Sequence, residues 1–324
     1  MLFAFVELVV GLAALFGGGH YLVRGATAVA LLLRISPSIV GLTVVAMGTS
    51  MPELAVSLDA AAKGVTDIAY GNVIGSNIFN IGAILGIAAL LGTIPVKHQT
   101  IRIEYPFMLV VSALVVLLGR DGIIDHIEGL FFVVSLVLFL SYIVYLARRE
   151  VLADQAVDLE REVRRAAHLD GGTGRAVGRN VAFLTLGIGA LVVGAELVVE
   201  GAVSMARTMG IEERVIGLTI VAMGTSLPEL ATTVVAAKNR EQEIALGNIV
   251  GSNIFNMLAI LGTTAAIIPV PIHPRAGAVD NWVMLGFAAI LFPMMVWGRS
   301  VSRRDGVVLL VGFVAYMAWV VVAR

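Results

Sequence analysis

Two glutamates, Glu53 and Glu229, lie inside long apolar stretches, each directly after a proline. Proline donates no backbone hydrogen bond and crowds the carbonyl four residues before it, so the carbonyls of Gly48 and Gly224 are expected to be free. Carboxylates and free carbonyls are hard oxygen ligands, which Ca²⁺ binds in sets of about six to eight. The two stretches therefore predict a site for a hard cation.

Further oxygen ligands surround both glutamates in the sequence. Hydroxyl and amide side chains stand beside them and in the apolar stretches that follow: Thr49, Ser50, Ser76 and Asn80, then Thr225, Ser226, Ser252 and Asn256. Ser76 and Asn80 are four residues apart, so a helix would place them on one face. The set contains no histidine or thiolate, which argues against zinc or copper. The apolar interiors also contain no basic residue that could pair with the glutamates.

Other polar residues of these stretches leave two interpretations open. They are Asn72, Asn77, Asn248 and Asn253, and the same question applies to Ser76 and Ser252. Such side chains either contribute to an ion site or serve helix packing and backbone capping inside a membrane.

The composition of the 324 residues is that of a polytopic membrane protein. Hydrophobic residues make up 59% of the chain and charged residues only 14%, and the mean hydropathy is +0.96. These values exclude a soluble enzyme and a disordered protein. The net charge of -1 excludes the basic surface that nucleic acids require. The absence of cysteine excludes a disulfide framework, an iron–sulfur cluster and thiol catalysis.

About 20 apolar residues cross a bilayer as a helix, and by this criterion the chain has ten candidate spans. They are residues 2–23, 36–62, 67–91, 103–119, 123–147, 180–204, 214–237, 243–268, 279–298 and 306–323. The runs are continuous instead of alternating with period two, so a β-barrel is disfavoured. The first span has no basic residue before it, which predicts a retained helix and not a cleaved signal peptide.

The two halves of the sequence repeat at an offset of 176 residues. Residues 40–57 and 216–233 share 13 of 18 identities, and residues 71–86 and 247–262 share 12 of 16. Each half has an odd number of spans, so the second copy must enter the membrane from the opposite side. The predicted fold is an all-α membrane protein with two inverted five-helix repeats, 1–147 and 180–324, joined by a linker at 148–179.

The distribution of basic residues orients this arrangement. With the N-terminus outside, 16 of the 22 basic residues fall on the inner side, including seven arginines of the linker. The positive-inside rule therefore predicts a cytoplasmic linker, with both termini outside the inner cell membrane.

The paired motifs GTSMPEL with GNVIGSNIFN, and GTSLPEL with GNIVGSNIFN, resemble the two α-repeats of the cation/calcium exchanger superfamily. The resemblance is greatest to prokaryotic sodium/calcium exchangers and covers the whole chain. It implies a protein without enzymatic activity that exchanges Na⁺ for Ca²⁺ by alternating access. We also expect no cofactor, and a monomer in the bilayer. The resemblance also implies that the first and sixth spans slide past a fixed ion-binding core. Glycines along these spans either permit such sliding or only tight static packing.

The resemblance assigns ligand roles residue by residue. Glu53 and Glu229 match calcium-binding carboxylates, and Thr49 and Thr225 match carbonyl ligands beside them. Sodium ligands are matched by the carbonyls of Ala46 and Ala222 and by the hydroxyls of Ser50, Ser226, Ser76 and Ser252. Asn80 and Asn256 match amide positions. Some family members have aspartate at one of these two positions, so this chain has two carboxylates where they have three.

Three other functions compete with sodium/calcium exchange. A Ca²⁺/H⁺ antiporter is the nearest alternative, because buried glutamates can exchange a cation for a proton. A cation channel is disfavoured by the inverted repeat. An intramembrane hydrolase is disfavoured because the spans contain no HExxH motif and no serine–lysine pair.

Overall fold

Helices make up most of the residues that the structure describes, as the apolar stretches predict. The computed structural model describes residues 2–33, 35–150, 173–210, 222–274 and 276–322. Among these residues, seven helices are long and apolar enough to cross a membrane, and a helix pair broken at Ser50 makes an eighth. The chain is therefore an all-helical, multi-pass membrane protein.

Two expected spans, the seventh and the tenth, are not among these eight. The seventh, 214–237, starts in residues 214–221, which lie outside the described residues. The tenth coincides with helix α17, Arg303–Val322. Most of the expected linker, residues 151–172, also lies outside the described residues.

The described residues form two units, each of which combines segments from both halves of the sequence. Unit 1 contains Met1–Thr49 and Leu138–Asn248, and unit 2 contains Ser50–Val137 and Ile249–Arg324. Two helices pass from one unit to the other, α8 at His126–Glu150 and α14 at Gln242–Phe255.

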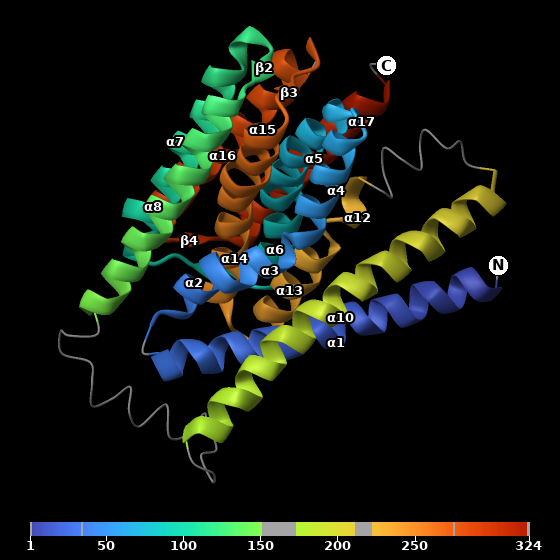
Figure 1. Cartoon of the computed structure of the whole chain (residues 1–324). Coiled ribbons are helices and arrows are strands. Elements are labelled where there is room, and N and C mark those ends of the chain that lie inside the picture. Colours follow the sequence, from blue (N-terminus) through green and yellow to red (C-terminus); the bar gives the residue numbers. More distant parts are fainter. Residues whose placement is uncertain (1, 34, 151–172, 211–221, 275, 323–324) are drawn as a thin grey trace. The chain divides into compact units, whose positions relative to one another are not determined.

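Unit 1 is built around two long helices, α1 at Leu2–Leu33 and α10 at Thr173–Thr208, which lie side by side in Figure 1. The other elements are short: α2 at Pro37–Val40, the π-helical turn η1 at Gly41–Val45, α3 at Ala46–Thr49, α12 at Ala222–Gly224 and α13 at Leu227–Lys238. Leu22, Leu191 and Ile244 are buried in a core shared by α1, α10 and α14.

Glycines spaced seven residues apart allow α1 and α10 to approach closely. They are Gly11, Gly18 and Gly25 on α1, and Gly187, Gly194 and Gly201 on α10. A methyl group added to Gly11 would lie 2.8 Å from the carbonyl oxygen of Gly194, and one added to Gly18 would lie 2.9 Å from that of Gly187. These glycines therefore allow the two helices to pack closely, and close packing is compatible with both interpretations of the glycines. Sliding of the pair stays a prediction.

Unit 2 contains the longer run of elements. From the first half of the chain come α4 at Met51–Ala62, α5 at Thr66–Phe79, η2 at Asn80–Leu85, α6 at Gly86–Leu91, β1 at Ile94–Pro95, η3 at Thr100–Glu104, α7 at Tyr105–Leu118, η4 at Gly119–Asp121 and β2 at Ile123–Ile124. From the second half come η6 at Asn256–Leu261, α15 at Gly262–Ile267, β3 at Val270–Pro271, η7 at Ala276–Asp280, α16 at Asn281–Gly298, β4 at Ser300–Val301 and α17.

Elements of unit 2 that repeat in sequence also make matching contacts. Strand β1 pairs antiparallel with β4, and β2 pairs antiparallel with β3. The π-helical turns η2 and η6 start 176 residues apart, as do η3 and η7. The two halves of the chain therefore contribute equivalent elements to unit 2.

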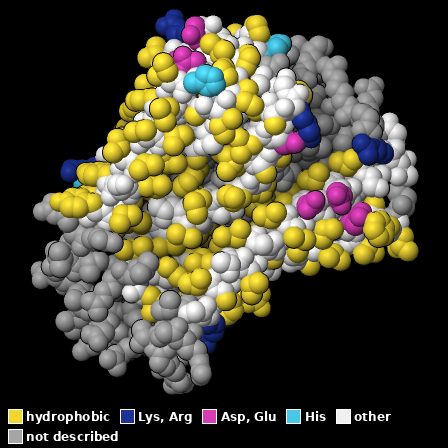
Figure 2. Space-filling view, viewed as in Figure 1, with side chains coloured by type: hydrophobic (Ala, Val, Ile, Leu, Met, Phe, Trp, Pro, Cys, Tyr) yellow, Lys and Arg dark blue, Asp and Glu magenta, His cyan; other side chains and the backbone are white. Residues whose placement is uncertain are grey.

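Hydrophobic side chains cover the outward faces of the long helices. On α8, for example, Ile127, Leu130, Val134 and Leu138 are all more than 45% exposed, and Figure 2 shows hydrophobic side chains spread over this helix. Such a surface suits the hydrocarbon of a bilayer, because its backbone groups are paired within the helix and its side chains need no water.

Candidate ion-binding site

Both motif copies break their helix at the same serine. The backbone of Ser50 has φ −85° and ψ 8° between α3 and α4, and that of Ser226 has φ −89° and ψ 10° between α12 and α13. In each case proline is the second residue of the next helix, where its missing N–H costs no helical hydrogen bond. Each of these two spans therefore contains a break two residues before its proline.

The break places each glutamate in the first turn of a helix. Glu53 lies in the first turn of α4 and Glu229 in the first turn of α13, where the exposed N–H groups of the helix favour a carboxylate. Each residue is only 1% exposed. A charge at the centre of a bilayer costs several kcal/mol unless its surroundings or a counter-ion compensate it, roughly 3 on insertion scales.

Most of the other predicted ligands are buried as well. Buried polar ligands are Thr49, Ser50, Ser76, Asn80, Ser226, Ser252 and Asn256, and Ala46 is buried beside them in sequence. Thr225 is partly exposed and Ala222 lies on α12. Nowhere in the described ranges do three Asp, Glu, His or Cys side chains cluster. A cation here would thus need hydroxyl, amide and carbonyl oxygens in addition to carboxylates.

The twelve predicted ligands are divided evenly between the two units. Unit 1 contains Ala46, Thr49, Ala222, Thr225, Ser226 and Glu229, and unit 2 contains Ser50, Glu53, Ser76, Asn80, Ser252 and Asn256. Each unit therefore has one carboxylate, one serine at a helix break and further oxygen ligands.

In unit 1, Asn248 of α14 connects three elements. Its Nδ2 donates to Thr233 Oγ1 at 3.0 Å and to the carbonyl oxygen of Glu229 at 3.5 Å. Its Oδ1 accepts from Thr49 Oγ1 at 3.2 Å, and the Thr49 hydroxyl also lies 3.3 Å from the carbonyl oxygen of Ala46. Asn248 thereby holds the backbone of one predicted ligand and the side chain of another.

Asn72 of α5 makes the equivalent contacts in unit 2. Its Nδ2 donates to Ser57 Oγ at 3.0 Å and to the carbonyl oxygen of Glu53 at 3.1 Å. The question that the sequence left open for Asn72 and Asn248 is thus answered in part: both hold the helix that contains a glutamate. Ser57 and Thr233 were missed, although the 176-residue offset relates them too.

Four buried asparagines pair with one another in unit 2. Asn80 Nδ2 donates to Asn253 Oδ1 at 3.2 Å, and Asn256 Nδ2 donates to Asn77 Oδ1 at 3.0 Å. Asn80 and Asn256 each begin a π-helical turn, a feature that concentrates at functional sites.

Three oxygens in this region accept no hydrogen bond from the described residues. They are Oδ1 of Asn80, Oδ1 of Asn256 and Oγ of Ser252, and all three are buried. Buried polar atoms normally have a partner, so oxygens of this kind are suited to bind a cation.

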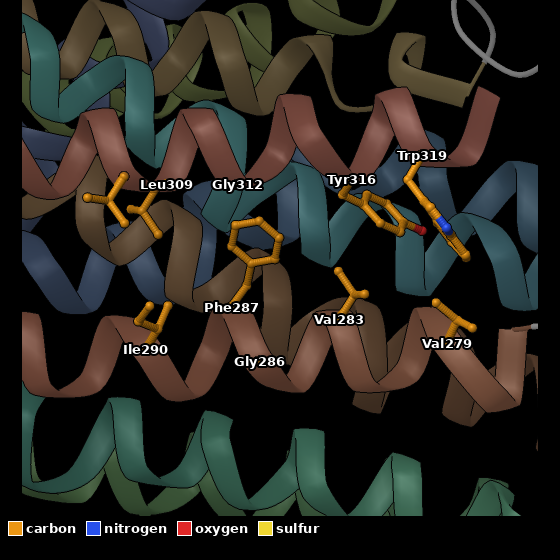
Figure 3. A pocket seen from close by; sticks show the side chains of 10 residues that line it. Val279, Val283, Gly286, Phe287, Ile290, Leu309, Gly312, Tyr316 and Trp319 are labelled. Carbon is orange, nitrogen blue, oxygen red and sulfur yellow. The ribbon is translucent and has the colours of Figure 1, made fainter. Parts of the chain in front are cut away.

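Two surface grooves differ in chemistry from this region. A groove of about 470 Å³ between α16 and α17 is lined by apolar side chains such as Val283, Phe287, Ile290 and Leu309, which suit hydrocarbon and not a cation (Figure 3). A polar groove of about 500 Å³ between α1 and α10 is lined by Glu7, Glu200 and Arg207, among others, and Glu200 is exposed there.

Comparisons with known proteins identify close relatives of the whole chain. Residues 3–149 and 179–322 match the family described as sodium/calcium exchanger protein. The putative antiporter CaxA of Alkalimonas amylolytica is 40% identical over 319 residues, covering 98% of each chain. The sodium/calcium exchanger MaX1 of Methanosarcina acetivorans is 33% identical over 349 residues, covering 97% of each. A solved structure of the sodium–calcium exchanger NCX_Mj, soaked without Na⁺ and Ca²⁺, matches with a TM-score of 0.85 and 28% identity, covering 98% of this chain and 99% of that one.

Proposed function

Because this chain belongs to the sodium/calcium exchanger family and is of the prokaryotic type, we propose that it exchanges Na⁺ for Ca²⁺ across the membrane by alternating access. Members of this family are transporters and not enzymes. The relatives named sodium/calcium exchanger span the whole chain, and structures of NCX_Mj come from crystals soaked with Na⁺, Ca²⁺ or Sr²⁺.

The observation that carries the proposal is the buried pair of helix-terminal glutamates in matching positions. Glu53 and Glu229 together have two negative charges, which balance one Ca²⁺. Hydroxyl, amide and carbonyl oxygens of the same segments complete a hard ligand set, and Ca²⁺ accepts such mixed sets. Na⁺ uses the same oxygen ligands but brings half of the charge, so the two ions compete for one set of carboxylates.

The proposed architecture has ten spans in two inverted repeats, 1–147 and 180–324, with the ions bound at the midplane between them. It is supported by the repeated motifs and by the reciprocal contacts of β1 with β4 and β2 with β3. The linker 148–179 is cytoplasmic in this proposal, and both termini are outside. In this proposal helices α1 and α10, which pack closely against each other, move as one pair during alternating access.

The coupling ion is tested with purified protein in liposomes loaded with Na⁺. We expect uptake of radioactive Ca²⁺ when Na⁺ flows outward, and little uptake when internal Na⁺ is replaced by choline. Uptake driven by an outward H⁺ gradient alone would instead show a Ca²⁺/H⁺ antiporter. Uptake that needs neither gradient would contradict an antiporter and show a channel.

A further inference from the structure

Each of the two ligand amides of unit 2 is the first member of a hydrogen-bonded relay that ends on a methionine. In the first relay, Asn256 Nδ2 donates to Asn77 Oδ1 at 3.0 Å, and Asn77 Nδ2 lies 3.6 Å from the thioether sulfur of Met284 on α16. The three side chains are each 1% exposed, so water does not compete for these bonds.

The second relay has the same order of contacts. Asn80 Nδ2 donates to Asn253 Oδ1 at 3.2 Å, and Asn253 Nδ2 lies 3.7 Å from the sulfur of Met108 on α7. All three of these residues are also buried. Met108 and Met284 are 176 residues apart, which is the offset of the sequence repeat. The same connection therefore occurs twice in the molecule.

The methionine sets the direction of each relay. A thioether has no hydrogen to donate and can only accept. Asn77 must therefore turn its Nδ2 toward the sulfur of Met284 and its Oδ1 toward residue 256. In the same way, Asn253 turns its Nδ2 toward Met108 and its Oδ1 toward residue 80. Because an oxygen faces residues 256 and 80, each of these residues must supply a hydrogen-bond donor. An asparagine amide provides one, whereas an ionised aspartate has none and would face a second oxygen in a buried place.

From this order of contacts we propose that Asn77 and Asn253 are positioning residues, and that Met284 and Met108 act through them to require neutral amides at positions 256 and 80. Each ligand asparagine then gives its N–H to the relay and keeps its Oδ1 for the ion, in agreement with the unpartnered Oδ1 atoms of Asn80 and Asn256. The relays thereby limit the carboxylates of the ion site to Glu53 and Glu229. The inference rests on the proposed function, because it concerns ligands for the transported ion.

The test is a double-mutant cycle between position 256 and position 284, with the Kd for Ca²⁺ measured by isothermal titration calorimetry in detergent. Asn256→Asp alone adds a negative charge, yet we expect it to weaken Ca²⁺ binding by about tenfold. The reason is that the hydrogen bond to Asn77 Oδ1 is lost and a carboxylate oxygen then faces that oxygen. Met284→Leu keeps the volume nearly unchanged and is expected to weaken binding less than about threefold. In the Met284→Leu background, Asn77 is free to turn its Nδ2 toward the aspartate, and Asn256→Asp should then strengthen Ca²⁺ binding.

The matched control is Met295→Leu, because Met295 is buried on the same helix and lies outside the relay. We expect Asn256→Asp to weaken binding equally in the Met295→Leu and wild-type backgrounds. The proposal is overturned if Asn256→Asp has the same effect with Met284→Leu as without it. The cycle of Asn80→Asp with Met108→Leu gives an independent second answer.

The unfolding temperature of the ion-free variants separates this inference from the proposed function. Asn256→Asp should lower the unfolding temperature of the wild type more than it lowers that of Met284→Leu. If Asn256→Asp folds only when it is combined with Met284→Leu, that result supports the relay in the same way. Wild-type protein that binds no Ca²⁺ would refute the proposed function and the ligand role of the amides. Wild-type protein that binds Ca²⁺ but shows no coupling in either measurement would refute the relay alone.

Discussion

Thr49 and Asn248 are hydrogen-bonded at 3.2 Å although 199 residues separate them in the sequence. The bond joins the end of α3 to the middle of α14, and Asn248 also bonds to the backbone of Glu229. One asparagine thus connects a hydroxyl beside the first helix break to the helix that begins at the second.

Removing this connection should lower both stability and ion affinity. Asn248→Ala leaves buried partners without their hydrogen bonds, and we expect it to cost about 1–3 kcal/mol of unfolding free energy. Thr49→Val removes only the hydroxyl and should cost about 1 kcal/mol. Thermal unfolding in detergent and Ca²⁺ titration measure the two effects. A wild-type unfolding temperature in Asn248→Ala would contradict the structural role of Asn248.

Neutralising either carboxylate should abolish most Ca²⁺ transport. Glu53→Gln and Glu229→Gln keep an oxygen ligand but remove a charge, so two charges no longer balance the divalent ion. We expect at least about tenfold slower Ca²⁺ uptake at limiting Ca²⁺, a loss of roughly 1.4 kcal/mol or more. Glu128→Gln is the matched control, because Glu128 lies in the first turn of α8, with its carboxylate bonded to the backbone N–H of Asp125 at the surface. Normal uptake by either glutamine variant would refute its assigned role.

Two adjacent glycines of α1 should respond oppositely to alanine. A methyl group at Gly18 would lie 2.9 Å from the carbonyl oxygen of Gly187, whereas one at Gly17 would meet nothing within 4 Å. Gly18→Ala should therefore destabilise the protein by about 1–3 kcal/mol through overpacking. Gly17→Ala should stabilise it by up to about 1 kcal/mol, because alanine favours the helix. Equal unfolding temperatures for the two variants would show that α1 and α10 do not pack as closely as described.

The stability of the protein should depend on pH through Glu241, which lies between α13 and α14. Burial is the main reason that the pKa of Glu241 lies above its ordinary value of 4.5; Thr27 partly offsets this rise in pKa, and the Glu243 carboxylate adds to it. The folded protein therefore holds this proton to a higher pH than the unfolded chain does. As pH rises through the interval between the two pKa values, the unfolded state is favoured and stability is lost.

Glu241→Gln removes this loss, so its unfolding temperature should exceed that of the wild type at about pH 8 and approach it at about pH 4. The surface variant Glu128→Gln serves as the control for general effects of charge. A difference between Glu241→Gln and wild type that stays constant with pH would contradict the raised pKa of Glu241.

The sequence by itself determined the class of protein, the repeat and the two prolines next to which the helices break. These features depend on local properties: the length of apolar runs, the missing N–H of Pro52 and Pro228, and motifs copied at an offset of 176 residues. The family resemblance rested on the same local motifs, and comparison of the whole chain confirmed it.

Only the tertiary structure decided which polar side chains bond to each other. Asn72, Asn77, Asn248 and Asn253 have the same residue type and lie in similar motifs, but two hold glutamate-bearing helices and two orient other asparagines. Likewise, the seven-residue glycine spacing in α1 and α10 did not reveal that these glycines face one another. Each of these partners is chosen by close approach in space between segments distant in sequence, and the direction of each amide depends on whether the atom opposite it can donate or only accept a hydrogen bond.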